Sequence, residues 1–104
     1  MIRKAFVLQL RPGAEDEYVH RHSPIWPELE QVLQQHGAHN YSIFLHPGTG
    51  QLFGYVELES AERWGAIAHT AVQRRWRAYM QDIIAADSDG TPQAVPLREV
   101  FHLP

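Results

Sequence analysis

Residues 38–58 read AHNYSIFLHPGTGQLFGYVEL and contain two strand-like runs on either side of a turn. The runs at 38–46 and 51–58 are rich in aromatic and branched apolar side chains, which favour strands. Between them, residues 47–50 supply one proline and two glycines, which favour a tight loop. We therefore expect these two strands to form an antiparallel hairpin.

The segment before this hairpin predicts one strand and one divided helix. Residues 3–10 alternate in the way a strand does, with Phe6, Leu8 and Leu10 on one side. Residues 14–36 predict a helix that prolines 24 and 27 interrupt, so we expect two helical pieces with a joint near His22.

Short signals predict where the helices begin and end. Ser23 followed by Pro24 has the form of an N-cap and a first helical residue, and Gly37 is a usual residue after a helix C-terminus. After the hairpin, residues 60–67 and 70–84 predict a second helical region that follows a capping sequence.

The last part of the chain completes an α+β pattern. A polar loop with Asp89, Gly90 and Pro92 leads to a final strand expected over 95–103. The order β-α-β-β-α-β describes a ferredoxin-like split βαβ sandwich. Because 104 residues suffice for one hydrophobic core and not for two, we expect a single domain over residues 1–104.

Composition narrows the classes of partner. Apolar residues at 44% and charged residues at 20% are ordinary for a globular protein. A net charge of -3 gives no basic surface for nucleic acid or anionic lipid, and no apolar run is long enough to span a membrane. Cysteine is absent and the N-terminus lacks the apolar core of a signal peptide, so we expect a cytoplasmic protein with a small, uncharged ligand.

Both sides of the predicted strands carry apolar residues. Tyr41, Ile43 and Leu45 oppose Ser42 and Phe44 in the first hairpin strand, although helices are expected to cover only one face of the sheet. Large exposed apolar faces usually mark interfaces, so the pattern predicts a symmetric homodimer that forms through the open sheet face. The alternative is an aromatic-lined cavity in a monomer.

One histidine among seven stands in a distinctive setting. Tyr18 precedes His22 by one helical turn and Trp26 follows it by another, which would gather a phenol, an imidazole and an indole. Such a surface suits a sugar, because aromatic faces pack on its C–H groups while polar tips meet its hydroxyls. The alternative is plain aromatic core. None of the histidines has ligand partners at metal-binding spacing, so we expect no metal.

The whole chain resembles the L-rhamnose mutarotase family. The resemblance rests on five stretches in family order: MIRKAFVLQL, HSPIWPELE, HGAHNYSIFL, ERW and QRRWRAYM. HSPIWPELE and HGAHNY are the most specific of these. The resemblance implies ferredoxin-like subunits in a dimeric α/β-barrel assembly. It also implies an isomerase that interconverts the anomers of L-rhamnose without a cofactor.

The resemblance also implies a set of site residues. His22 matches the family's proton donor, and Tyr18, Tyr41 and Trp76 match residues that hold the sugar. At position 77 some family members have a second tryptophan, whereas this chain has Arg77, which could donate hydrogen bonds to sugar hydroxyls or face water.

Mutarotation needs only proton transfers, one from the anomeric hydroxyl and one to the ring oxygen. A histidine can give or take a proton near neutrality, so His22 is the expected catalytic residue. The second group is left open: a tyrosine, a water molecule, or one of the carboxylates Asp82 and Glu28, although such carboxylates usually lie on solvated helix faces.

Two other functions fit the same fold class. One is a cofactor-free oxygenase of the dimeric α/β-barrel type, which fold analogy alone permits. The other is a non-catalytic module that binds a small sugar.

Overall fold

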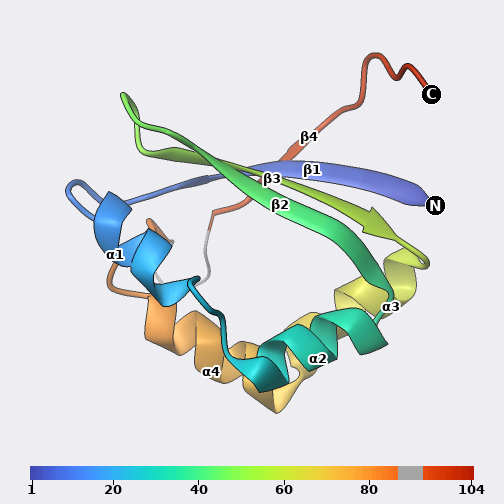
Figure 1. The fold of residues 1–104 in the computed structure, drawn as a ribbon, viewed down its shortest axis with the longest axis horizontal. Helices are drawn as coiled ribbons and strands as arrows, with labels where there is room; N and C mark the ends of the chain where they lie inside the picture. Colours follow the sequence, from blue (N-terminus) through green and yellow to red (C-terminus); the bar gives the residue numbers. More distant parts are fainter. Residues whose placement is uncertain (87–92) are drawn as a thin grey trace.

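The computed structural model describes residues 1–86 and 93–104, and the predicted loop with Asp89, Gly90 and Pro92 lies largely outside them. A four-stranded antiparallel sheet forms one layer, and the helices cover one of its faces (Figure 1). The elements follow in the order β1 (Ile2–Gln9), α1 (Glu15–Arg21), α2 (Pro27–Gln35), β2 (Ala38–His46), β3 (Gln51–Leu58), α3 (Ala61–Ala66), a 3₁₀ turn (Ile67–His69), α4 (Ala71–Met80) and β4 (Val95–Leu97). This order confirms the α+β, ferredoxin-like prediction.

The central pair of strands organises the sheet, whose strand order is β2-β3-β1-β4. β1 and β3 pair over their whole length, from Ile2 opposite Leu58 to Gln9 opposite Gln51. β2 pairs with the other edge of β3, as the hairpin prediction requires, and β4 pairs with β1. The pairing places alternate residues of each strand on the helix side.

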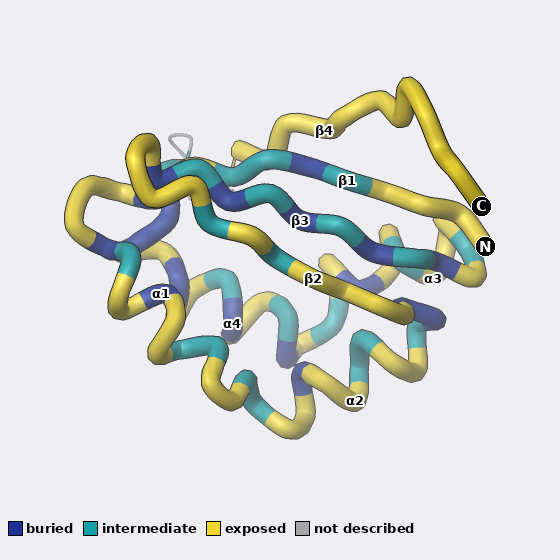
Figure 2. The backbone as a smooth tube through the Cα atoms, turned by 45° about the horizontal axis from the view of Figure 1, so that its top comes forward, coloured by how far each residue is buried: buried dark blue, intermediate teal, exposed yellow. Residues whose placement is uncertain are grey.

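The core lies between this helix-facing side and the helices. Leu52, Val56 and Leu58 of β3 are 0–1% exposed, and buried positions alternate along the strand (Figure 2). Helices contribute the apolar stripes that cover them, because residues three and four apart share one helix face. The largest cluster of buried residues contains Leu10, Ala14, Tyr18, Leu29, Leu52, Val72, Trp76, Met80, Ile83 and Ile84.

A β-bulge changes the face of the sheet toward which the side chains of β2 point. The pairing of β2 with β3 is irregular between His39 and Ser42, and Asn40 has a φ of 49°. Asparagine tolerates this left-handed region better than most residues. A bulge inserts one extra residue and re-aims the side chains that follow. As a result, Tyr41 points to the helix side, where its ring lies 6.3 Å from Phe6 and 5.7 Å from Trp64, measured between ring centroids.

The predicted joint in the first helical region is confirmed, but the predicted cap is wrong. α1 ends at Arg21, and α2 begins at Pro27 with Trp26 in the N-cap position, not at Pro24. The pyrrolidine ring suits a first helical position, so Pro27 is the residue that starts the second helix. Gly37 has a φ of 82° after the end of α2, which confirms the predicted glycine stop.

The end of the second helical region also differs from the prediction. α4 stops at Met80 because the chain turns back to the sheet: Ile84 bridges Leu10, and the amide of Ala85 donates to the Gln9 carbonyl at 2.8 Å. Leaving the helix buries Ile83 and Ile84 in the core.

The final strand is shorter than predicted. β4 covers Val95–Leu97, and residues 98–104 leave the edge of β1 without regular structure (Figure 1). Pro96 cannot donate to a ladder, and the apolar residues after it find no surface on their own chain. Val100, Phe101 and Leu103 are therefore 77–81% exposed.

A substitution at Gly54 tests the packing of Phe6, the ring that contacts Tyr41. Gly54 lies opposite Phe6, and a methyl group at position 54 would overlap the Phe6 ring. We expect Gly54→Ala to lower the free energy of unfolding by about 1–3 kcal/mol through overpacking. Gly65→Ala is the matched control, because position 65 is in α3 and faces open space, so it should be neutral or stabilise by up to about 1 kcal/mol. Urea unfolding measures both, and equal effects would contradict this view.

Candidate active site

His22 stands directly after α1 and rests on Tyr18, one turn earlier. The two rings stack with centroids 4.1 Å apart and planes 28° apart. Tyr18 is 6% exposed and belongs to the core, so it forms a fixed base under the imidazole. The predicted pairing of phenol and imidazole is confirmed.

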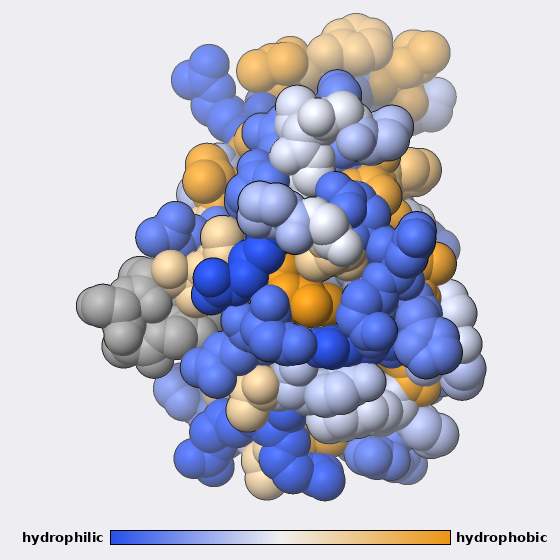
Figure 3. All heavy atoms as spheres, turned by 90° about the vertical axis from the view of Figure 1, so that its left-hand side faces the viewer, coloured by the Kyte–Doolittle hydropathy of each residue, from blue (hydrophilic) through white to orange (hydrophobic). Residues whose placement is uncertain are grey.

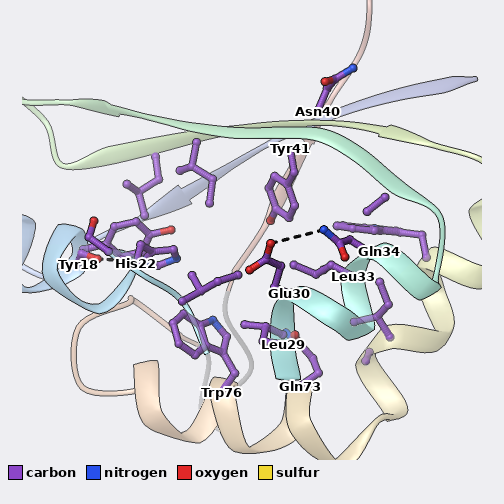
Figure 4. Close-up of a pocket in the computed structure, with 18 of the residues that line it drawn as sticks. Tyr18, His22, Leu29, Glu30, Leu33, Gln34, Asn40, Tyr41, Gln73 and Trp76 are labelled. Carbon is purple, nitrogen blue, oxygen red and sulfur yellow. Dashed lines mark hydrogen bonds between the residues drawn. The ribbon is translucent and has the colours of Figure 1, made fainter. Parts of the chain in front are cut away.

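A backbone hydrogen bond determines which nitrogen of His22 carries the hydrogen. Nδ1 lies 2.9 Å from the carbonyl oxygen of Tyr18, one helical turn earlier. Since a carbonyl can only accept, Nδ1 must be the donor in this bond. In the neutral ring, Nε2 is then left with a free lone pair. His22 lines a large cavity, and Figure 4 shows its ring at the cavity edge beside Tyr18.

Burial sets the charge state of this imidazole. Removal from water lowers the pKa of His22 below its ordinary value, and the hydrogen bond to the Tyr18 carbonyl opposes this effect only in part. The neutral ring is therefore the main form at neutral pH. Its free Nε2 can accept a proton, and the resulting imidazolium can return one.

The indole of Trp76 forms a second wall. It meets His22 edge-on, with ring centroids 5.2 Å apart and planes at 88°. Trp26 does not reach His22 as predicted, because the chain leaves the helix after Arg21 and the helical spacing is lost. Trp26 instead packs edge-on against Trp76 at 5.0 Å and stacks on Tyr79. It therefore supports the wall from behind without lining the cavity.

Arg21 fastens α1 to the end of α4. Its guanidinium donates to both carboxylate oxygens of Asp82 at 2.9 and 3.1 Å, to the Tyr79 carbonyl at 2.7 Å and to Glu17 at 2.9 Å. These bonds hold Arg21, which directly precedes His22, against α4, the helix that carries Trp76. They also engage Asp82, one of the two carboxylates considered for proton transfer, and keep it as a structural ion pair.

Tyr41 enters the same space from the sheet. Although 37% of its surface is exposed, its side chain hangs from β2 toward the helices (Figure 4), and burial raises the pKa of Tyr41 to about 12. Burial also raises the pKa of Tyr18 well above its ordinary value. Both phenols therefore stay protonated at neutral pH and can donate hydrogen bonds.

The cavity between the sheet and the helices has a volume of about 750 Å³. Its walls bring together four of the predicted site residues, Tyr18, His22, Tyr41 and Trp76. Apolar side chains cover most of the remaining wall, and hydrophilic side chains surround apolar surface at the end of the molecule that carries α1 (Figure 3). A mostly apolar pocket with a few polar groups is the usual form of a small-molecule site.

The fifth predicted residue, Arg77, lies in an adjoining space. It lines a smaller cavity of about 130 Å³ and does not line the larger one. His22, Tyr18, Tyr41 and Trp76 border both cavities. Arg77 is thus next to the site, on the other side of the same aromatic residues.

Sequence analysis missed several polar and aromatic residues of the large cavity. Glu30, Gln34, Trp64 and Gln73 all line it, whereas Glu28 does not. The signal for Glu30 and Gln34 was their helical spacing beside Leu29 and Leu33, which line the same cavity. Using that spacing required knowing which face of α2 turns toward the sheet.

Within residues 1–86 and 93–104, no group of three or more histidine, aspartate or glutamate side chains is placed to hold a metal ion. In the same part of the chain, every helix is too short or too polar to cross a bilayer.

Known proteins match this chain along its whole length. The sequence profile of a family described as L-rhamnose mutarotase matches residues 3–103. The chain belongs to the L-rhamnose mutarotase family. An L-rhamnose mutarotase from Opitutus terrae is 58% identical over 99% of both chains, and one from Escherichia fergusonii is 56% identical over 100% of both.

Solved structures agree with this family assignment. The crystal structure of an L-rhamnose mutarotase from Formosa agariphila covers 100% of both chains, with a TM-score of 0.90 and 33% identity. An antibiotic biosynthesis monooxygenase shares the fold at a TM-score of 0.63 and 16% identity, over 95% of this chain and 99% of that one. The latter likeness concerns the fold alone. The comparisons therefore favour the mutarotase prediction over the oxygenase and the sugar-binding module.

The protonation of His22 can be measured directly. We expect ¹⁵N NMR to show hydrogen on Nδ1 and a bare Nε2, and a pH titration to give His22 a midpoint below the ordinary value of 6.5. The exposed His20 of the same helix is the internal control and should lack the hydrogen-bond signature of a fixed Nδ1–H. A hydrogen on Nε2 at neutral pH would contradict the assigned roles.

Proposed function

We propose that this chain interconverts the α and β anomers of L-rhamnose, with His22 as the proton-transfer residue. The observation that carries the proposal is the free Nε2 of a neutral imidazole bordering a cavity, in a chain of the mutarotase family. Tyr18, Tyr41 and Trp76 would hold the sugar. The phenols would donate to its oxygens, and the indole would pack against its apolar C–H groups.

His22 alone can carry out both proton transfers of the reaction. Nε2 of His22 takes the proton of the anomeric hydroxyl, the bond between C1 and the ring oxygen breaks, and its electron pair leaves with that oxygen. The imidazolium then returns the proton to the ring oxygen, which is within reach because both oxygens are bonded to C1. Rotation about the C1–C2 bond of the open aldehyde exposes its other face, and the reverse steps close the other anomer.

The environment of His22 supports both halves of this exchange. The lowered pKa keeps the resting ring neutral and able to accept, and it makes the imidazolium a stronger acid than a free one. A phenol that stays protonated can stabilise negative charge on the ring oxygen as it develops. No step changes the oxidation state of the sugar.

Arg77 is a proposed contributor to sugar choice. Arg77 lines the smaller cavity together with His22 and Trp76, and its guanidinium would donate to a hydroxyl that extends between the aromatic rings.

The central test replaces the imidazole. We expect His22→Ala to slow the exchange between L-rhamnose anomers by about 10²- to 10⁴-fold, the usual contribution of one positioned acid or base, while the sugar still binds. Saturation-transfer NMR measures the exchange, and a chemical-shift titration measures binding. His20→Ala is the control, since His20 lies in α1 two residues before His22 and lines neither cavity. Wild-type exchange in His22→Ala would end the proposal.

We also infer that two copies of this chain associate through the open face of the sheet. Phe44 of β2 is 66% exposed on that face, and Val95 and Leu97 of β4 are exposed on the same face at the opposite edge of the sheet. Residues 98–104 follow β4 and expose Val100, Phe101 and Leu103, and Arg3 donates to Glu99 at the start of this segment at 2.7 Å. Exposed apolar side chains gathered on one face are typical of an interface, and they support the predicted homodimer over the monomeric alternative.

The association has a simple test. We expect the wild-type protein to sediment as a dimer and Phe44→Glu to sediment as a monomer, because a carboxylate would be buried without a partner. Gln31→Glu adds the same charge on the exposed side of α2 and should leave the dimer intact. A monomeric wild type, or a dimeric Phe44→Glu, would contradict the inferred interface.

A further inference from the structure

Glu30 is the one carboxylate in the wall of the large cavity, among the residues that the structure describes. No lysine or arginine side chain lines that cavity either. The other polar groups of the lining, which include the phenols of Tyr18 and Tyr41 and the amides of Gln34 and Gln73, are neutral and can each donate a hydrogen bond. Glu30 is thus the strongest acceptor in the cavity.

The position of Glu30 is fixed by the packing of α2. Leu29, its neighbour, is buried in the core cluster that contains Tyr18 and Trp76. The amide of Glu30 donates to the carbonyl of Trp26 at 3.1 Å, and Trp26 in turn packs against Trp76. One turn of helix therefore separates the carboxylate-bearing residue from the aromatic group that supports the wall beside His22.

Figure 4 shows where the carboxylate points. Glu30 is partly open to solvent, and its carboxylate lies below the hydroxyl of Tyr41, while His22 and Tyr18 lie to one side of it. A ligand between these groups would present one end to His22 and another to Glu30.

The carboxylate keeps most of its acceptor capacity free. Its one hydrogen bond within the described residues comes from Gln34, four residues on, at the long distance of 3.5 Å. An ionised carboxylate offers about four acceptor sites, and bonds to a charged acceptor are stronger than those between neutral groups. A neutral ligand rich in hydroxyls would supply the missing donors.

We propose that Glu30 is a specificity-determining residue that accepts hydrogen bonds from two adjacent ring hydroxyls of the sugar. Gln34 orients the carboxylate, and the bonds hold the ring so that its anomeric carbon lies at Nε2 of His22. This inference rests on the proposed mutarotase function. It assigns Glu30 to binding and leaves proton transfer to His22.

The experiment compares Glu30→Gln and Glu30→Ala with Glu28→Gln. Glu28 is exposed on the same helix, as Glu30 is, but lines neither cavity, so its variant should match wild type. NMR gives the Kd for L-rhamnose from shift titration, and KM, kcat and the pH profile of kcat from anomer exchange. We expect both Glu30 variants to raise Kd and KM by about 10- to 100-fold, the worth of hydrogen bonds to a charged group, with kcat changed by less than about 5-fold and an unaltered pH profile.

Sugars that lack single hydroxyls identify the bonded pair. Wild type should bind L-rhamnose more tightly than the analogues deoxygenated at two neighbouring ring carbons, and Glu30→Ala should lose that discrimination. This coupling distinguishes a direct contact from a general disturbance of the pocket.

Two results would overturn the assignment. Unchanged Kd and KM in both variants would show that Glu30 does not hold the sugar. A large loss of kcat with unchanged KM and a lost limb of the pH profile would make Glu30 a proton-transfer group instead. Failure of the mutarotase proposal is a separate result, since it would appear as no acceleration of exchange by wild type, and the Kd comparison would still test Glu30.

Discussion

Burial of the helix-facing side of β1 and β3 is the interaction on which the rest of the molecule depends. Leu52, Val56 and Leu58 are almost completely removed from water there, and each such side chain contributes roughly 1.5–3 kcal/mol to folding. β2 and β4 attach only to this central pair, and the helices cover only this face. Every wall of the cavity is therefore anchored, directly or through one neighbour, to the same two strands.

The candidate site occupies the part of the sheet–helix interface that the core does not fill. At the level of Leu10, Leu52 and Met80 the two layers meet, and these side chains are nearly fully buried. Toward β2 the layers leave a cavity of about 750 Å³. Tyr18 and Trp76 belong to both regions, since they pack in the core and also face the cavity. Their burial in the core fixes the orientation of the two rings that contact His22.

The sequence predicted the features that depend on local periodicity. The hairpin of residues 38–58, the stacking of Tyr18 and His22 and the glycine stop at Gly37 all follow from spacing along one element. The family resemblance, which rested on short motifs, brought Tyr41 and Trp76 to the same site. The structure indeed brings these residues together around one cavity.

Features that depend on contacts distant in the chain could not be predicted in this way. The helix predicted to continue to residue 84 ends earlier because Ile84 forms a β-bridge with Leu10, and no local sequence signal predicts that pairing. Trp26 does not lie one helical turn after His22, because α1 has ended and α2 begins only at Pro27. Glu30 was overlooked for the same reason, since a glutamate on a helix usually faces water, and only the tertiary arrangement shows that this exposed one also lines the cavity.

The bulge at Asn40 makes the pocket sensitive to chain length more than to residue type. Strict alternation from Ala38, which faces the helices, would send residue 41 to the opposite surface; the additional residue in β2 reverses this. Losing or gaining a single codon there would move a phenol from the ligand space to the outer surface and leave a gap over Phe6. Divergence of this pocket is therefore expected to proceed by exchange of side chains within a strand whose residue count is held constant.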